Sequence, residues 1–212
     1  LFSAIMFRLF ELILGGNIQK TGLPNNHPFV RFAQSPDQIS LALQLDDTVF
    51  WGALPLLIEA EDPLISSFSS RLRARNLLKC IDVTQAIVAK LGAKPGSTEE
   101  SITKAKKQVK KVAVSVQESI QEWLDNNPTS PPRLLIDQTD RHPYKRFQES
   151  KGPLNQISIR REGGGIFDMA EESHVIAGLE PFSLLRVYYS EDDPVAKKVV
   201  LETIDQKVKG EQ

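Results

Sequence analysis

Basic residues are closely spaced in one segment of the first half of the chain. Arg71, Arg75 and Lys79 are separated by four residues each, so on a helix they would form one ridge, with Arg73 between them. Arginine offers a fixed pair of donors to a phosphate and lysine a mobile charge, which makes Arg71, Arg75 and Lys79 candidate nucleotide- or phosphate-binding residues. The other interpretation is ion pairing with nearby acidic residues and a favourable interaction with the helix dipole. Composition alone favours this second interpretation.

A second group of basic residues lies on a predicted long helix. It consists of Lys104, Lys106, Lys107, Lys110 and Lys111. These side chains fall opposite an apolar stripe that includes Ile102, Val109 and Val116. A solvated lysine face is the simpler interpretation. The alternative is a secondary anion-binding surface, for which Lys104, Lys107 and Lys111 are the candidates.

Residues that usually carry catalysis or bind metals are few and scattered. The 3 histidines are His27, His142 and His174, and the 1 cysteine is Cys80, so no metal-binding cluster and no cysteine pair is indicated. Cys80 is interpreted as a small core residue. The glycine run 163–165 precedes a predicted strand, which favours a hairpin turn over a phosphate-binding loop. We therefore predict no catalytic residue, no metal ligand and no cofactor in this chain.

Composition narrows the class of protein. The chain has 212 residues, of which 41% are apolar and 25% charged, and its formal net charge is −1. These values are typical of a soluble protein with a core, and they argue against nucleic-acid or anionic-membrane binding as its main role. No apolar run approaches the roughly 20 residues of a membrane span. The single cysteine favours a reducing compartment, and we predict a cytoplasmic protein.

Helical patterns dominate the first part of the chain. Predicted helices cover Leu1–Leu14, a segment from Asp46 to Leu57, Asp62 to about Lys79, and an amphipathic segment at about 98–124 that follows a capping box at Ser97. The first is apolar almost all round, which predicts burial on every side. Pro55 is expected to bend the second helix or end it early. The segment Lys20–Pro36 is predicted to be a loop.

Strand patterns follow. Short strands are predicted at Leu134–Ile136 and Arg186–Tyr189, a β-hairpin from Ile157–Arg161 and Ile166–Met169, and a last helix after Asp193-Pro194. Helices first and antiparallel strands later indicate an α+β fold. We predict a helical region 1–125 and a small α+β region 133–212. Because Leu1 starts inside a predicted helix, we expect the chain to continue a longer protein.

Several separated segments carry motifs in a fixed order. They are Phe7–Glu11, Leu45–Trp51, Asp62-Pro63, Arg75–Lys79 (Arg-Asn-Leu-Leu-Lys), Leu134–Asp137, Pro143–Lys145, Ile157–Ile159 and Arg186–Tyr189. Together these segments resemble the region downstream of the catalytic core in HD-domain phosphohydrolases, the group that includes deoxynucleoside triphosphate triphosphohydrolases. The resemblance covers most of the chain.

The resemblance has consequences for function. Family members bind a divalent metal through a His…His-Asp…Asp set that activates water against a phosphate ester or anhydride. The chain lacks this set, so the resemblance implies that metal and catalysis belong to a missing HD core. In nucleotide-activated relatives the Arg-Asn-Leu-x-Lys motif contributes to a regulatory nucleotide site between subunits, which implies Arg75 and Lys79 as ligands and a homo-oligomer. Ala4 and Ile5 replace the family's His-Lys pair, so no phosphate contact is implied there.

Two classes of function therefore remain. The first is the C-terminal accessory or regulatory portion of an HD-type phosphohydrolase that acts on nucleotides or other phosphate esters. Such a chain would contribute to assembly and to nucleotide or anion binding without being catalytic alone. The alternative is a non-catalytic oligomerisation or partner-binding module. An independent enzyme comes third, because no acid–base or nucleophile constellation can be assembled from the residues.

Overall fold

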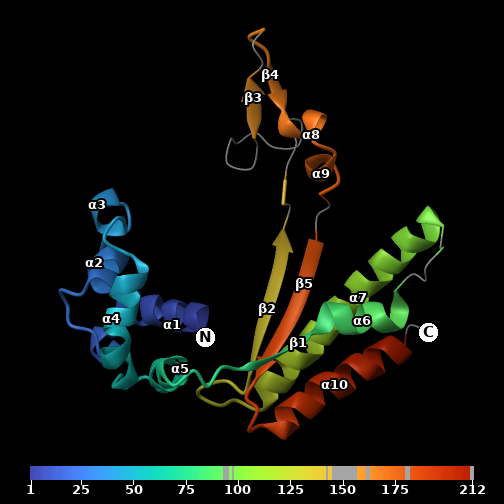
Figure 1. Cartoon of the computed structure of the whole chain (residues 1–212). Helices are drawn as coiled ribbons and strands as arrows, with labels where there is room; N and C mark the ends of the chain where they lie inside the picture. Colours follow the sequence, from blue (N-terminus) through green and yellow to red (C-terminus); the bar gives the residue numbers. More distant parts are fainter. Residues whose placement is uncertain are drawn as a thin grey trace. The chain divides into compact units, whose positions relative to one another are not determined.

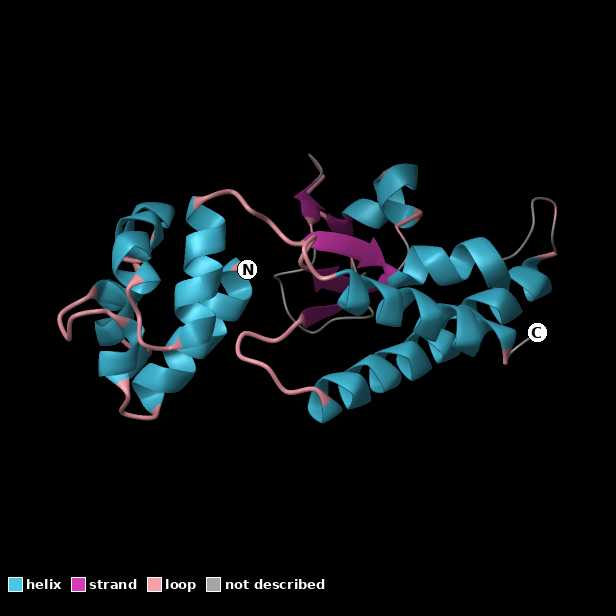
Figure 2. Ribbon diagram, turned by 90° about the horizontal axis from the view of Figure 1, so that it is seen from below, coloured by secondary structure: helices cyan, strands magenta, loops and turns pink. Residues whose placement is uncertain are grey.

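A computed structural model describes residues 1–92, 96, 98–141, 143–144, 157–160, 163–179 and 182–210. The fold is α+β, as predicted: a mostly helical N-terminal part is followed by a small antiparallel sheet and a C-terminal helix (Figure 1). Figure 2 distinguishes the helices from the strands. The chain forms two compact units. Unit 1 comprises Leu1–Cys80, Glu118–Leu135 and Tyr188–Thr203, and unit 2 comprises Ile81–Gln117, Ile136–Val187 and Ile204–Gln212. The division into regions 1–125 and 133–212 stays a prediction.

Unit 1 is built mainly from helices at the start of the chain. They are α1 (Phe2–Leu14), the 3-10 helix η1 (Ile18–Thr21), α2 (Pro28–Gln34), α3 (Ile39–Ala42), α4 (Asp47–Ile58) and α5 (Pro63–Arg73). Helix α5 packs against α1 and α4, and α1 also packs against α2. Their shared core includes the fully buried side chains of Ile5, Leu57 and Phe68. These contacts fix the position of α5, whose C-terminal end carries Arg71, the first residue of the predicted basic ridge.

Helix α1 differs from its prediction on one side. Ile5 and Leu9 are fully buried, but Phe7 is 79% exposed and Leu14 is 71% exposed. Seven residues are almost two helical turns, so Phe7 and Leu14 lie on one face. The expectation of burial on every side is therefore wrong for this face, because α2 and α5 cover only the opposite one.

The segment Lys20–Pro36 is not the loop that its glycines and prolines predict. It contains α2, which begins at Pro28 after His27. The Nδ1 atom of His27 accepts a hydrogen bond from the backbone N–H of Phe29 at 3.2 Å. Histidine thus takes the capping role that Ser, Asp or Asn usually fill, and proline at the first helical position needs no N–H partner.

Helix α4 begins where the capping residues predict. The Asp46 carboxylate accepts a hydrogen bond from the N–H of Val49 at 2.8 Å. The helix then runs through Pro55 to Ile58, so of the two predicted effects of proline the early end is wrong, and the bend stays a prediction. Proline removes one backbone donor. The buried side chains of Leu54 and Leu57 on either side of it keep the helix packed in the core.

The three-stranded sheet has the order β1-β5-β2. Its strands are β1 (Lys79–Asp82), β2 (Leu134–Arg141) and β5 (Phe182–Tyr189). Strands β2 and β5 confirm the predicted strands and are longer: β2 continues through polar residues to Arg141, and β5 begins earlier, at Phe182. Strand β1 stands where the end of a helix was predicted. Cys80 is exposed on this edge strand, so its interpretation as a core residue is wrong.

Unit 2 contains α6 (Val83–Leu91) and most of α7 (Glu99–Asn126). Helix α6 was not predicted from the sequence; it begins where the Asp82 carboxylate accepts the N–H of Gln85 at 2.9 Å. Helix α7 confirms the predicted long amphipathic helix, and its buried stripe includes Val109, Val112 and Val116. At its start the Thr98 hydroxyl accepts the N–H of Ser101 at 3.4 Å.

The predicted hairpin is present in unit 2. Strands β3 (Ser158–Arg160) and β4 (Ile166–Asp168) pair antiparallel, with Ile159 opposite Phe167. Two short helices follow, α8 (Met169–Glu172) and α9 (His174–Ala177). After β5 comes α10 (Pro194–Lys209). Helix α10 confirms the predicted last helix, since the Asp193 carboxylate accepts the N–H of Ala196 at 3.0 Å.

Some sequence predictions concern residues outside the described part of the chain. These residues are 93–95 of the predicted helix break, Ser97, His142, Lys145, Arg161 and Glu162. Within the described part, no helix is both long and apolar enough to cross a membrane.

Candidate functional site

The predicted basic ridge does not form, because α5 ends before two of its members. Helix α5 stops at Arg73, and Arg75 has a left-handed backbone conformation with φ of 55°. The N–H of Asn76 donates to the carbonyl of Arg71 at 2.9 Å, and the N–H of Arg75 donates to the carbonyl of Leu72 at 3.2 Å. This pair of bonds is the Schellman motif that closes a helix. Arg71 therefore lies in α5, Arg75 in the turn and Lys79 in β1.

Replacing Arg75 by glycine is expected to raise the free energy of unfolding by about 0.5–1 kcal/mol, because glycine adopts the left-handed conformation without a clash at Cβ. Urea denaturation followed by circular dichroism measures the change. Arg75→Ala is the matched control, since it removes the side chain and keeps the strained backbone, and it should give no gain. Equal stability of the two variants would show that the turn is not strained.

The structure nevertheless brings Arg71 and Lys79 to the same loop of unit 1. Nη2 of Arg71 donates to the Ser190 hydroxyl at 2.8 Å. Nζ of Lys79 lies 3.1 Å from a carboxylate oxygen of Glu191. Ser190 and Glu191 are consecutive residues directly after β5. Two of the three predicted phosphate-binding residues thus reach one loop from α5 and β1, while the side chain of Arg75 is exposed in the turn between them.

The guanidinium of Arg71 has unused bonding capacity. Its Nη1 atom is buried and has no hydrogen-bond partner among the described residues. A buried donor without a partner typically costs about 1–3 kcal/mol. The neighbouring Lys79–Glu191 ion pair contributes little to stability, because both side chains are more than half exposed to solvent. The partnerless donor of Arg71 and the exposed Lys79–Glu191 pair make this loop the candidate anion site.

A third cation at this loop was missed by the sequence analysis. Nε and Nη2 of Arg133 donate to the two carboxylate oxygens of Asp193 at 2.7 and 2.6 Å. The guanidinium also lies over the Trp123 ring, 5.2 Å from its centroid. The hydrogen bond from Arg133 lowers the pKa of Asp193, and burial opposes this shift. The bidentate pair with Asp193 holds Arg133 in place, which makes Arg71 and Lys79 the cations of this loop that are better able to change partners.

The second predicted basic group lies on α7 in unit 2. The side chains of Lys104, Lys107 and Lys111 on α7 are exposed. They share the solvent side of the helix with Lys106 and Lys110, opposite the buried valine stripe. This arrangement agrees with a solvated lysine face.

The histidines occupy separate positions. His27 caps α2, and burial lowers its pKa. His174 begins α9. Among the described residues, no three or more His, Cys, Asp or Glu side chains come together as a metal ion would require.

No model of a known protein family matches the chain, and no curated protein matches it. The crystal structure of a phosphohydrolase from Bacteroides thetaiotaomicron is partly similar, with a TM-score of 0.41 and 20% sequence identity. The match covers 88% of this chain and 42% of that chain, so this chain spans less than half the length of that phosphohydrolase.

Proposed function

We propose that this chain is the accessory C-terminal portion of a phosphohydrolase of the HD type that acts on nucleotides or other phosphate esters. In this proposal the chain contributes to assembly of a cytoplasmic homo-oligomer and binds a regulatory nucleotide through Arg71, Arg75 and Lys79. The divalent metal and the catalytic residues belong to a core outside this chain. The sequence motifs suggest the nucleotide, and the geometry of the loop after β5 supports an anion site.

The convergence of Arg71 and Lys79 on consecutive loop residues is the observation that carries the proposal. Among the residues that the structure describes, Arg71 supplies a donor without a partner, and Lys79 pairs with an exposed carboxylate. A nucleotide phosphate would displace Glu191 from Lys79 and rotate the half-buried guanidinium of Arg71 to form charge-assisted hydrogen bonds. Arg75 would add its charge from the exposed turn between them.

A thermal-shift experiment on the full chain tests the proposal. ATP at about ten times its Kd stabilises a protein that binds it by about 1.4 kcal/mol, which corresponds to a Tm rise of about 3–5 °C for a chain of this size. We expect this rise for the wild type and less than half of it for Arg75→Ala combined with Lys79→Ala. Glu191→Gln should enlarge the rise, because it removes the competing carboxylate.

The matched control is Lys104→Ala combined with Lys107→Ala, which removes the same charge from the exposed face of α7. This variant should keep the full ATP shift; if it loses the shift instead, the anion surface lies on α7. Inorganic triphosphate separates nucleotide recognition from general anion binding. An unchanged ATP shift in Arg75→Ala/Lys79→Ala would refute the site.

A different observation favours the alternative of an oligomerisation or partner-binding module. Four apolar side chains of unit 1 are at least 71% exposed: Phe7, Leu14, Ile39 and Leu43. A contiguous exposed apolar patch is a frequent mark of a contact surface, and Phe7 and Leu14 share one face of α1. If the wild type shows no ATP shift and still self-associates in sedimentation velocity, the module interpretation replaces the regulatory one.

A further inference from the structure

Ser190 lies in the loop after β5, directly in front of three acidic residues. It is the one serine or threonine of the chain that three consecutive acidic residues follow, namely Glu191, Asp192 and Asp193. Ser190 is partly exposed, and the side chains of Glu191 and Asp192 are exposed. Protein kinases select their substrates partly by charge pattern, and a kinase with a basic substrate groove favours a hydroxyl that acidic side chains follow. The sequence at Ser190 therefore fits an acid-directed kinase.

The hydroxyl of Ser190 contacts a cation that has no counter-ion. Nη2 of Arg71 donates to this hydroxyl at 2.8 Å. Among the residues that the structure describes, no carboxylate forms an ion pair with Arg71, and its buried Nη1 atom has no hydrogen-bond partner. The other two cations of the loop, Lys79 and Arg133, each pair with a carboxylate. The charge of Arg71 thus meets only a neutral hydroxyl.

A phosphate on Ser190 would supply the counter-ion. Phosphoserine carries about 1.5 to 2 negative charges at neutral pH and three acceptor oxygens. The phosphate would be attached to the oxygen that Nη2 already contacts, and Nη1 belongs to the same planar group, so one guanidinium can donate to two phosphate oxygens. Repulsion by the following carboxylates is reduced, because Glu191 and Asp193 are paired with Lys79 and Arg133.

We propose that Ser190 is a phosphorylation site for an acid-directed serine/threonine kinase and that Arg71 holds the phosphate. In the transfer, the Ser190 oxygen forms a bond to the γ-phosphorus of ATP, and the bond from that phosphorus to the oxygen bridging the β- and γ-phosphates breaks. ADP leaves, and the hydroxyl proton passes to the carboxylate base of the kinase. One consequence rests on the proposed function: a phosphate at Arg71 fills the candidate anion site and excludes the nucleotide.

Phosphorylation of the full chain tests the site itself. The chain is incubated with ATP, Mg²⁺ and an acid-directed kinase, and the modified residue is located by tandem mass spectrometry. We expect phosphate at Ser190. Glu191→Gln combined with Asp192→Asn should slow the reaction about tenfold, because the kinase recognises these charges. Glu59→Gln combined with Glu61→Gln removes two exposed charges elsewhere in unit 1 and should leave the rate unchanged. A folded chain without phosphate at Ser190 would overturn the proposal.

Phosphorus-31 NMR of the modified chain tests the contact with Arg71. A neighbouring cation lowers the second pKa of a phosphate, which is about 6 for an exposed phosphoserine. We expect this pKa to be about 0.5–1 pH unit lower in the chain than in a phosphorylated peptide of residues 186–196, which carries the same acidic residues without Arg71. Arg71→Gln keeps a donor for the loop without the charge and should remove most of the difference. Equal pKa values in chain and peptide would refute the contact.

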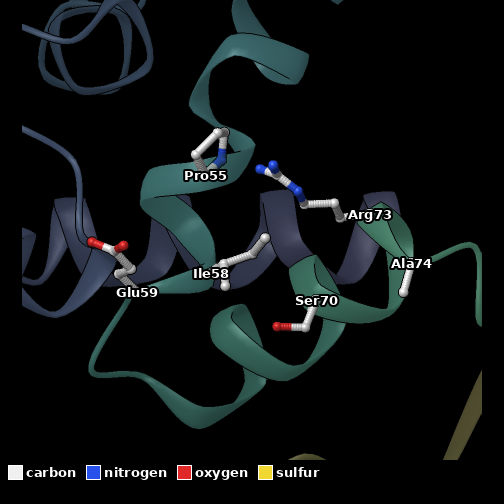
Figure 3. A pocket seen from close by; sticks show the side chains of 6 residues that line it. All are labelled: Pro55, Ile58, Glu59, Ser70, Arg73 and Ala74. Atoms are coloured by element: carbon white, nitrogen blue, oxygen red, sulfur yellow. The ribbon is translucent and has the colours of Figure 1, made fainter.

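Arg73→Ala is the matched control for Arg71→Gln. Arg73 is exposed and lies two residues further along α5. Its guanidinium extends towards Pro55 of α4, across the hollow that both residues line (Figure 3). This variant should keep the lowered pKa of the phosphate. If Arg73→Ala raises that pKa as much as Arg71→Gln does, the general positive charge of α5 is the cause, and the proposed contact with Arg71 is wrong.

The consequence for the nucleotide is measured separately. The phosphorylated chain should show less than half of the ATP-induced Tm rise of the unmodified chain, because Arg71 is occupied. An equal rise would show that phosphate and nucleotide do not share Arg71. If the unmodified chain shows no rise, the proposed nucleotide site fails, while the modification of Ser190 and the pKa of its phosphate still decide the present proposal.

Discussion

Asp62→Ala is expected to lower the free energy of unfolding of unit 1 by about 2–4 kcal/mol, because this carboxylate holds two elements at once. One oxygen accepts the N–H groups of Leu64 and Ile65 at 3.1 Å each, which caps α5. The other lies 2.9 Å from Nε and 2.8 Å from Nη2 of Arg8 on α1. Alanine would remove the cap and leave a partly buried guanidinium without its main partner.

The expected loss can be divided by variants. Asp62→Asn keeps an oxygen for the cap and loses the charge, so it should cost about half as much as alanine. Glu11→Ala is the matched control, because Glu11 also pairs with Arg8 but is exposed, and its loss should cost less than about 0.5 kcal/mol. Urea denaturation followed by the fluorescence of Trp51 and Trp123 in unit 1 measures all three. A loss below 0.5 kcal/mol for Asp62→Ala would contradict this account, since the cap alone is worth about 1 kcal/mol.

The starts of helices were predictable from the sequence because their signals are local. Asp46 before α4 and Asp62-Pro63 before α5 carry both the acceptor and the backbone preference within a few residues. The spacing of Val109, Val112 and Val116 by three and four residues likewise matches the helical repeat and predicts the buried face of α7. A cap or a period needs no knowledge of the tertiary structure, and these elements lie where the sequence placed them.

The wrong predictions concern features that local sequence signals do not determine. Helix α5 ends at a turn in which Arg75 has a left-handed backbone conformation. Glycine at this position would have predicted the turn from the sequence. Because an arginine stands there, the spacing of Arg71, Arg75 and Lys79 suggested one continuous helix. His27 caps α2 although histidine is uncommon in that role. In both cases local geometry is maintained by the packed helices around it, which residue types alone do not encode.

The candidate site was predictable only in its residue types. The partners of Arg71 and Arg133, Ser190 and Asp193, lie 119 and 60 residues further along the chain. No local pattern relates such distant positions, and Asp193 was recognised only as a helix cap. The structure shows that one carboxylate serves as both the cap of α10 and the partner of Arg133, which fixes the loop that Arg71 and Lys79 share.

The largest expected loss of stability follows from Phe50→Ala in α4. Phe50 is 4% exposed, and its ring centroid lies 4.6 Å from that of Phe2 and 6.4 Å from that of Phe29, so it joins α1, α2 and α4 in one aromatic cluster. Removing a buried phenylalanine side chain leaves a cavity and typically costs about 3–5 kcal/mol. We expect a loss of this size in urea denaturation followed by circular dichroism at 222 nm.

Two further variants separate the causes of that loss. Phe50→Leu keeps most of the buried volume but removes the edge-to-face ring contacts, which are worth about 0.5–1.5 kcal/mol per pair, so it should cost less than alanine. Phe7→Ala on the exposed face of α1 is the matched control and should change stability by less than about 0.5 kcal/mol. If Phe50→Ala costs no more than Phe7→Ala, the aromatic cluster does not hold α1, α2 and α4 together. A large loss in Phe7→Ala would instead show that the exposed face of α1 is covered in solution, as the module interpretation requires.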